Sequence, residues 1–188
     1  MRLYRSLGRR TNGPTRPQKE MPNSRTSVIE TSSENTSKDI PGMDGFLQKY
    51  PTFDIEHFLS GATNAYKIIV KAFSEGDLNA LKPLLSKEVY NEFEIVIGKR
   101  DKRKDVCFSK FVGEVNASII GALIENNFYK ITLEYKSRQI NTTHDKTGVL
   151  IDGNPDTAFD SVDIWSFCKE IGSTSENWYL VETKEGDL

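Results

Sequence analysis

Cysteine, histidine and long apolar runs are all scarce in this sequence of 188 residues. The two cysteines, Cys107 and Cys168, have no Cys or His beside them at ligand spacing, and the two histidines, His57 and His144, lie far from both. A disulfide framework or a zinc site needs more of these residues than are present. We therefore expect two reduced thiols that act as small apolar side chains, no metal and no cofactor.

Apolar segments long enough to cross a bilayer are also missing. The longest nearly apolar run, residues 117–124, is much shorter than the roughly 18 residues of a transmembrane helix. We therefore expect the chain as written to contain no membrane-spanning segment.

Charge is divided unevenly along the chain. Residues 1–40 carry eight Lys or Arg and four acidic residues, whereas the remainder has a net charge of −6. Proteins that bind nucleic acid without sequence preference usually present a basic face. The acidic remainder therefore predicts no nucleic-acid partner.

Residues 1–44 differ in composition from the rest. They are rich in Ser, Thr, Pro and Asn, and Tyr4 is their single aromatic residue. Such a segment buries too little apolar area to offset the entropy lost on ordering. We predict a disordered basic tail over residues 1–44, resembling either a presequence or a juxtamembrane segment.

Apolar residues then follow the spacing of a long helix. From Ile55 to Phe73 they recur at steps of three and four, which places them on one face. Asp54 is suited to cap the helix at its start, and Gly76 to end it.

Two further helices are expected after the long one. The leucines of residues 78–84 predict a short helix, and residues 86–98 predict another with one apolar side. The charged stretch 99–105 is expected to be a solvated linker.

Beyond this linker the pattern changes from helical spacing to alternation, which is typical of strands. The alternating segments lie around residues 115–119, 129–135, 162–167 and 178–182. Helices followed by a run of strands predict an α+β fold, in which helices pack on one face of a curved antiparallel sheet. We expect this domain to span residues 45–184, with a short tail at 185–188.

Several blocks in this pattern resemble one known family. They begin at Phe53 (Phe-Asp-x-Glu-x-Phe-Leu-x-Gly-Ala), Asp163 (Asp-Ile-Trp-Ser-Phe) and Asn177 (Asn-Trp-x-Leu-Val). Together they resemble the C-terminal domain of the peripheral 44-kDa subunit of the mitochondrial inner-membrane protein translocase and its alphaproteobacterial relatives.

The resemblance implies a cone-shaped fold similar to nuclear transport factor two, with an apolar pocket between helices and sheet. It also implies a non-catalytic, membrane-associated binding module for an apolar ligand, lipid or partner segment. The expected partners are anionic membrane lipid and a protein-translocation or membrane-assembly component. The expected location is the cytoplasmic face of a bacterial inner membrane or, alternatively, the matrix side of the mitochondrial inner membrane. Because one fold serves many tasks, a ketosteroid-isomerase-like enzyme and a ribosome-associated assembly factor are alternatives.

Large apolar side chains of the helices and strands form either solid core or the wall of this pocket. Three of them, Tyr66, Tyr135 and Trp165, carry a polar atom that could orient a ligand head group. The predicted pocket residues are Phe58, Tyr66, Ile69, Phe73, Phe93, Leu133, Tyr135 and Trp165.

Membrane contacts are predicted at two places. Basic side chains near the start would be attracted to an anionic surface. Phe46 and Leu47, with Tyr50, either insert at the lipid interface or close the open end of the cone. The predicted membrane contacts are Arg2, Arg5, Arg9, Arg10, Phe46 and Leu47.

No group of residues in the sequence has the spacing of a catalytic site. Acid–base chemistry in a cone fold needs an Asp or Tyr with a shifted pKa inside an apolar pocket. Asp163 is the nearest candidate by position, but beside Trp165 on a strand it is expected to face solvent. We therefore predict no catalytic residues and no enzymatic activity.

Overall fold

The computed structural model describes residues 40–187, in which helices come first and strands follow. The helices are α2 (Met43–Lys49), α3 (Ile55–Glu75), α4 (Leu78–Leu81) and α5 (Lys87–Arg103). The strands are β1 (Val106–Phe111), β2 (Asn116–Glu125), β3 (Phe128–His144), β4 (Leu150–Gly153), β5 (Phe159–Glu170) and β6 (Tyr179–Glu185). This order confirms the α+β prediction.

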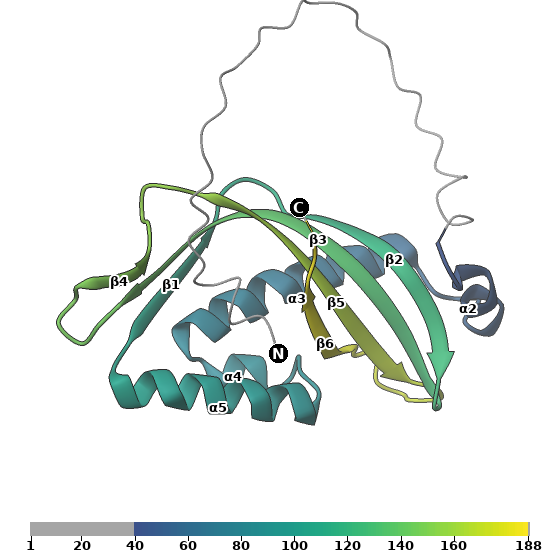
Figure 1. Cartoon of the computed structure of the whole chain (residues 1–188). Helices are drawn as coiled ribbons and strands as arrows, with labels where there is room; N and C mark the ends of the chain where they lie inside the picture. The colour runs from purple at the N-terminus through teal and green to yellow at the C-terminus, as the bar shows by residue number, and fades with distance from the viewer. Residues whose placement is uncertain (1–39, 188) are drawn as a thin grey trace, which may run out of the picture.

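Strand β3 is the spine of the sheet. It pairs antiparallel with β2 and β1 along one edge and with β5 and β4 along the other, and β6 extends the sheet beyond β5. Register shifts in the β2 and β6 pairings are irregularities of the kind that increase local twist. The sheet arches over α3, α4 and α5 without closing, which is the predicted cone-shaped fold similar to nuclear transport factor two (Figure 1).

The long helix forms where its sequence pattern predicts. The Asp54 side chain accepts a hydrogen bond from the His57 backbone N–H at 2.9 Å, which caps the start. At the end, Gly76 has a φ of 75°, and its N–H donates to the Ala72 and Phe73 carbonyls. This left-handed conformation suits glycine, so the predicted stop is confirmed.

Helix α5 is longer than predicted. It continues past Gly98 to Arg103, so the expected solvated linker over residues 99–105 is wrong. Arg100 is buried, donates a hydrogen bond to the Phe73 carbonyl and lies 4.7 Å from the Phe73 ring centroid. The basic last turn is also stabilised by the negative end of the helix dipole.

The folded unit begins before the expected boundary at residue 45. Met43 is fully buried, and the Pro41 carbonyl accepts a hydrogen bond from the Ala122 N–H at 2.9 Å. At the other end, the Gly186 N–H donates to the Val162 carbonyl at 2.8 Å, beyond the expected limit of residue 184. The predicted disorder of residues 1–44 falls mostly on residues 1–39, which lie outside the described part of the chain.

The helices of the described segment are short or amphipathic. Among residues 40–187 no helix combines the length and the apolar character that a membrane crossing requires.

Candidate ligand cavity

The predicted pocket residues lie together in the packed interior between helices and sheet. Each of the eight is at most 7% exposed. Tyr66 and Tyr135 stack with ring centroids 4.3 Å apart, and Trp165 lies 4.6 Å from Tyr66. Close packing of this kind is characteristic of core.

The polar atoms of these three aromatic residues are directed into the fold. The Tyr66 hydroxyl donates to Asp163 at 2.7 Å, and the Tyr135 hydroxyl donates to the Ala62 carbonyl at 3.0 Å. The Trp165 Nε1 is buried without a hydrogen-bond partner in the described part of the chain. In this conformation the two tyrosine hydroxyls are bonded within the protein, and a role of these residues in orienting a ligand head group stays a prediction.

Asp163 faces the interior, contrary to the sequence-based expectation. Its pairing opposite Tyr135 places it on the same face of β5 as Trp165, and it is only 5% exposed. Burial raises the pKa of this carboxyl, while hydrogen bonds from Tyr66 and Ser161 act in the opposite direction. Asp163 is thus the centre of a buried polar cluster.

A cavity of about 460 Å³ lies at the α2 end of the domain. We call it the aromatic cavity, because five aromatic side chains line it: Tyr50, Phe53, Phe58, Phe167 and Trp178. Of the predicted pocket residues it includes only Phe58.

The cavity exists because α3 presents small residues where it passes this end of the sheet. Gly61, Ala62 and Ala65 line the helical side of the cavity. A Cβ added at Gly61 would meet nothing within 4 Å. Larger side chains at these positions would reduce the space between the helix and the aromatic wall.

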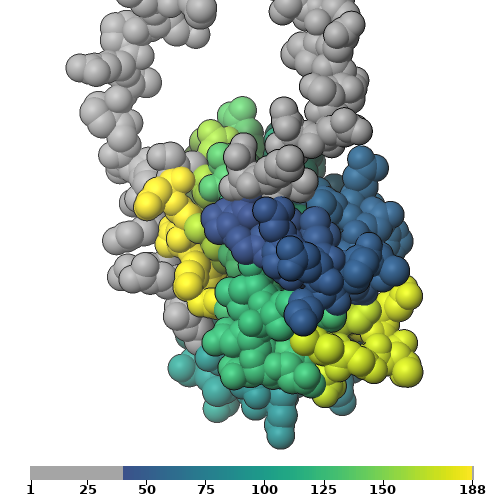
Figure 2. Space-filling view, turned by 90° about the vertical axis from the view of Figure 1, so that its right-hand side faces the viewer, coloured from purple at the N-terminus to yellow at the C-terminus, as the bar shows by residue number. Residues whose placement is uncertain are grey.

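The aromatic wall is built from segments that are distant in the sequence. Trp178, between β5 and β6, packs edge-on against Phe58 at 4.8 Å and against Phe53 at 5.9 Å. Figure 2 shows this end of the domain. The segment containing α2, in dark blue, lies beside the β2–β3 turn, in green, and beside later residues, in yellow-green.

One cation lies in the wall of the aromatic cavity. Lys169, near the end of β5, is 9% exposed, and its Nζ donates to the Tyr50 hydroxyl at 3.0 Å. The same ammonium lies 5.3 Å from the centroid of the Tyr50 ring. The cavity therefore combines apolar walls with one buried positive charge.

Phe46 does not face solvent in this structure, and its insertion into a membrane stays a prediction. It is 1% exposed and packs against Phe53 at 5.0 Å and Tyr129 at 5.3 Å. Leu47 is half-buried against the same core. The alternative, that these residues close the open end of the cone, fits their positions. The four predicted arginine contacts, Arg2, Arg5, Arg9 and Arg10, lie outside the described residues.

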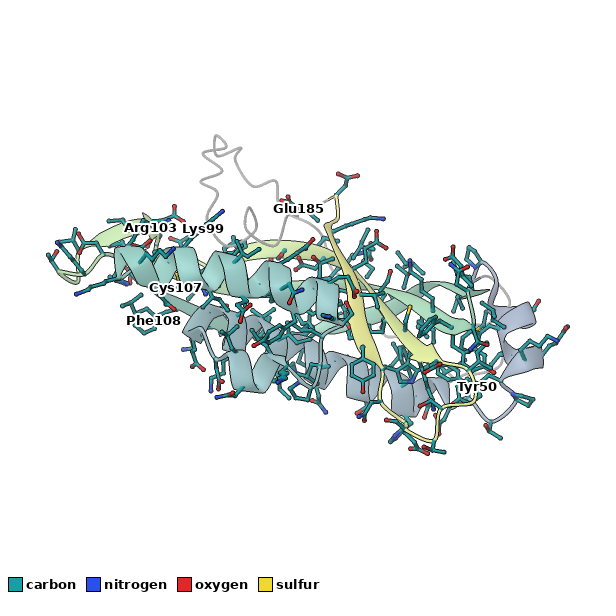
Figure 3. All side chains as sticks on the ribbon, turned by 90° about the horizontal axis from the view of Figure 1, so that it is seen from below. Tyr50, Lys99, Arg103, Cys107, Phe108 and Glu185 are labelled. Carbon is teal, nitrogen blue, oxygen red and sulfur yellow. The ribbon has the colours of Figure 1, made fainter. Side chains whose placement is uncertain are left out.

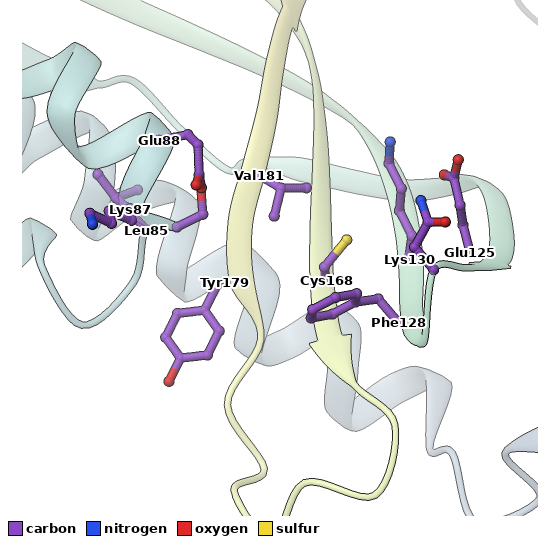
Figure 4. Close-up of a pocket in the computed structure, with 11 residues that line it drawn as sticks. Leu85, Lys87, Glu88, Glu125, Phe128, Lys130, Cys168, Tyr179 and Val181 are labelled. Carbon is purple, nitrogen blue, oxygen red and sulfur yellow. The ribbon is translucent and has the colours of Figure 1, made fainter.

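A second hollow, of about 550 Å³, lies on the outer face of the sheet near β6 (Figure 4). One of its charged residues, Lys130, pairs with Glu182 at 3.3 Å. Burial raises the pKa of the Cys168 thiol, which disfavours the reactive thiolate. This hollow has fewer features of a ligand site than the aromatic cavity.

Exposed apolar side chains gather at the end opposite the aromatic cavity. Val106 and Leu150 both pair with His144 in the sheet, and the Phe108 ring packs edge-on against His144 at 5.5 Å. We call this surface the β1–β4 wing, defined by Val106, Phe108, Val149, Leu150 and Ile151, which are 41–57% exposed.

Basic residues accompany the wing. Lys104 and Lys146 line a hollow together with Val106 and Phe108. Figure 3 shows Lys99, Arg103 and Phe108 at the end of the domain opposite Tyr50. The wing therefore combines apolar and cationic groups within an acidic domain.

The fold is a helix-on-sheet cone domain with an aromatic cavity at one end. Among residues 40–187, no three His, Cys, Asp or Glu side chains are grouped as a metal site. The family model described as Tim44-like domain matches residues 41–185, and the chain belongs to this family. The resemblance noted from the sequence is confirmed.

Other comparisons add little beyond the family. No curated protein sequence matches the chain. The intermembrane-space region of the chloroplast protein ARC6 is similar with a TM-score of 0.44 and 14% identity, over 68% of this chain and 95% of that chain. A periplasmic fragment of TraM has a TM-score of 0.45 and 9% identity, over 71% of this chain and 99% of that chain. Similarity at this level does not establish a shared function.

Proposed function

We propose that this Tim44-like domain is a non-catalytic binding module that works at a membrane surface and holds an amphipathic ligand in its aromatic cavity. The cavity itself carries the proposal. Small-molecule sites are typically concave, apolar and roughly 300–1,000 Å³ in volume, with a few placed polar groups. The aromatic cavity, at about 460 Å³ with Lys169 in its wall, has these properties.

The enzyme alternative has one observation in its favour, the buried Asp163. A raised pKa beside Tyr66 is what acid–base catalysis in a cone fold would use. However, neither residue lines the aromatic cavity, and one oxygen of Asp163 already accepts from Tyr66 and Ser161. A general base must reach the proton of a substrate, so we assign a structural role to the cluster of Asp163, Tyr66 and Ser161.

For membrane association we propose anionic lipid as the partner and the β1–β4 wing as a contact surface. Exposed apolar groups of this kind can enter a lipid interface, and Lys104 and Lys146 would attract anionic head groups. The basic arginines of the tail would add to this attraction.

The family is associated with protein translocation, so we also propose a translocation or membrane-assembly protein as partner. The site of action would be the cytoplasmic face of a bacterial inner membrane or the matrix side of the mitochondrial one. A ribosome-associated role is less favoured, because residues 41–188 have a net charge of −6.

Tryptophan fluorescence tests ligand binding directly. The chain has two tryptophans: Trp178 lines the cavity, whereas Trp165 is fully buried in the core. Titration with dodecanoate, dodecyl phosphate or dodecanol should change the emission of Trp178, and Trp178→Phe should abolish the change. If none of the three ligands changes the emission or binds by calorimetry, the proposed function is wrong.

A further inference from the structure

Lys169 has no acidic partner among residues 40–187. The residue is 9% exposed, and the salt bridges of the described residues do not include it. Its one hydrogen bond is to the hydroxyl of Tyr50, which is a neutral acceptor. A buried charge without a counter-charge is energetically unfavourable, since its hydration is lost and not replaced.

The geometry leaves this ammonium able to bind a further group. A lysine ammonium has three N–H donors, of which Tyr50 accepts one. The contact with the Tyr50 ring, at 5.3 Å, is near the outer limit of a cation–π interaction and offsets little of the lost hydration. Because Lys169 lines the aromatic cavity, a ligand there can supply the missing acceptor.

We propose that Lys169 binds the anionic head group of the ligand, so that the cavity selects an amphipath with one carboxylate or phosphate group. The inference rests on the proposed function, because it assigns the chemical class of the ligand in that cavity. The apolar body of the ligand would lie against Phe53, Phe58 and Trp178, which form the aromatic wall.

The other charged residues of the cavity favour a ligand with a single charge. Asp54 and Glu176 also line the cavity, at the start of α3 and in the β5–β6 connection. Their carboxylates would repel a second negative charge on the ligand. Asp54 and Glu176 are exposed and screened by solvent, whereas Lys169 is buried, so a head group with one negative charge is favoured over a neutral alcohol and over a polyanion.

The test compares ligands that differ only in the head group. Dodecanoate should bind wild-type protein about tenfold or more tightly than dodecanol, since about 1.4 kcal/mol corresponds to one factor of ten. Dodecyl phosphate, which carries about −1.5 to −2 charge near pH 7, should bind less tightly than dodecanoate. Lys169→Met should remove this preference by weakening binding of the two anions. Lys71→Met, at an exposed position of α3, should leave the preference unchanged. Dissociation constants are measured by calorimetry and by Trp178 emission.

The outcomes separate this inference from the proposed function. If all three ligands bind wild type and Lys169→Met with equal affinity, the role of Lys169 is wrong while the cavity ligand stands. If no ligand binds, the proposed function fails. Lys169→Gln and Lys169→Arg keep the test valid even where Lys169→Met does not fold. The preference for anions should be lost in Lys169→Gln and retained in Lys169→Arg. The reverse result overturns the proposal.

Discussion

The hydroxyl of Tyr66 on α3 donates a 2.7 Å hydrogen bond to the carboxyl of Asp163 on β5. These residues are 97 positions apart, and both are at most 5% exposed. Ser161 donates to the same carboxyl oxygen at 2.9 Å, and Gln139 donates to the Tyr66 oxygen at 3.0 Å. This polar cluster joins the helical layer to the sheet at the centre of the domain.

The Asp163 carboxyl predicts a particular dependence of stability on pH. Burial raises its pKa above the ordinary value of about 4, so the folded state binds a proton more tightly than the unfolded chain. The stabilisation of the folded state by the protonated Asp163 carboxyl is fully present below about pH 4. It is lost as the pH rises through the raised pKa of this carboxyl. Asp163→Asn removes the titration but keeps an oxygen that accepts from Tyr66. Relative to wild type, the variant should gain free energy of unfolding between about pH 4 and pH 8, measured by urea unfolding.

The control for this experiment is Asp160→Asn, which lies on the same strand at an exposed position. Its free energy of unfolding relative to wild type should vary much less with pH. A constant difference between Asp163→Asn and wild type across this range would contradict the burial of an ionisable carboxyl at this site.

Much of the fold follows from local sequence pattern. Helix α3 is recognisable because its apolar stripe, the capping residue Asp54 and the terminating Gly76 all indicate the same helix boundaries. Strand β3 is recognisable through residues 129–135, where apolar residues alternate cleanly. Strands β1 and β4 were not predicted, because their apolar side chains are exposed at the wing and flanked by charge.

Most of the candidate site could not be predicted from sequence. The aromatic cavity depends on contacts between Tyr50, Phe58 and Trp178, which belong to segments far apart in the chain. The inward direction of Asp163 depends on strand register, and a shift by one residue would reverse it. Alternation showed only that Asp163 and Trp165 share a face. The predicted pocket position of Trp165 therefore implied an inward Asp163, and the expectation that Asp163 faces solvent was wrong.

Truncation of the two tryptophans should have unequal effects. Trp165 is fully buried and contacts Tyr66, Tyr135 and Phe167, so Trp165→Ala should lower the free energy of unfolding by about 3–5 kcal/mol. Trp178→Ala should cost distinctly less, because that side chain is half-buried beside open space. Urea unfolding followed by circular dichroism measures both. Equal losses would indicate that the wall of the aromatic cavity is packed as tightly as the core.

Arg100 should contribute to stability, although it lies in a stretch that resembles a solvated linker. Arg100→Met leaves the buried Phe73 carbonyl without its side-chain donor and should cost about 1–3 kcal/mol. Lys102→Met, two residues further on the exposed side of α5, is the matched control and should be nearly neutral. If both variants unfold at the wild-type urea concentration, Arg100 does not join α5 to α3 in solution.

Membrane binding should depend on the β1–β4 wing. Replacing Phe108 and Leu150 together by Ser removes two exposed apolar groups of one face and should lower co-sedimentation with anionic vesicles about tenfold or more. Ile95→Ser, equally exposed on α5 but outside the wing, should bind like wild type. Added salt should weaken binding of all three proteins, since the Debye length falls from about 10 Å at 0.1 M to about 3 Å at 1 M. Wild-type binding that does not distinguish anionic from neutral vesicles at low salt would exclude anionic lipid as the partner.

Filling the aromatic cavity tests the central claim most directly. Ala65 lines the cavity, and its neighbour Asn64 points to solvent from the same helix, so Ala65→Phe and Asn64→Phe form a matched pair. The measurement is the dissociation constant of dodecanoate, obtained from the emission of Trp178. We predict that wild type and Asn64→Phe bind dodecanoate with equal affinity, whereas Ala65→Phe remains folded and binds about tenfold or more weakly. Equal binding by a folded Ala65→Phe variant would contradict the proposal that this cavity holds the ligand.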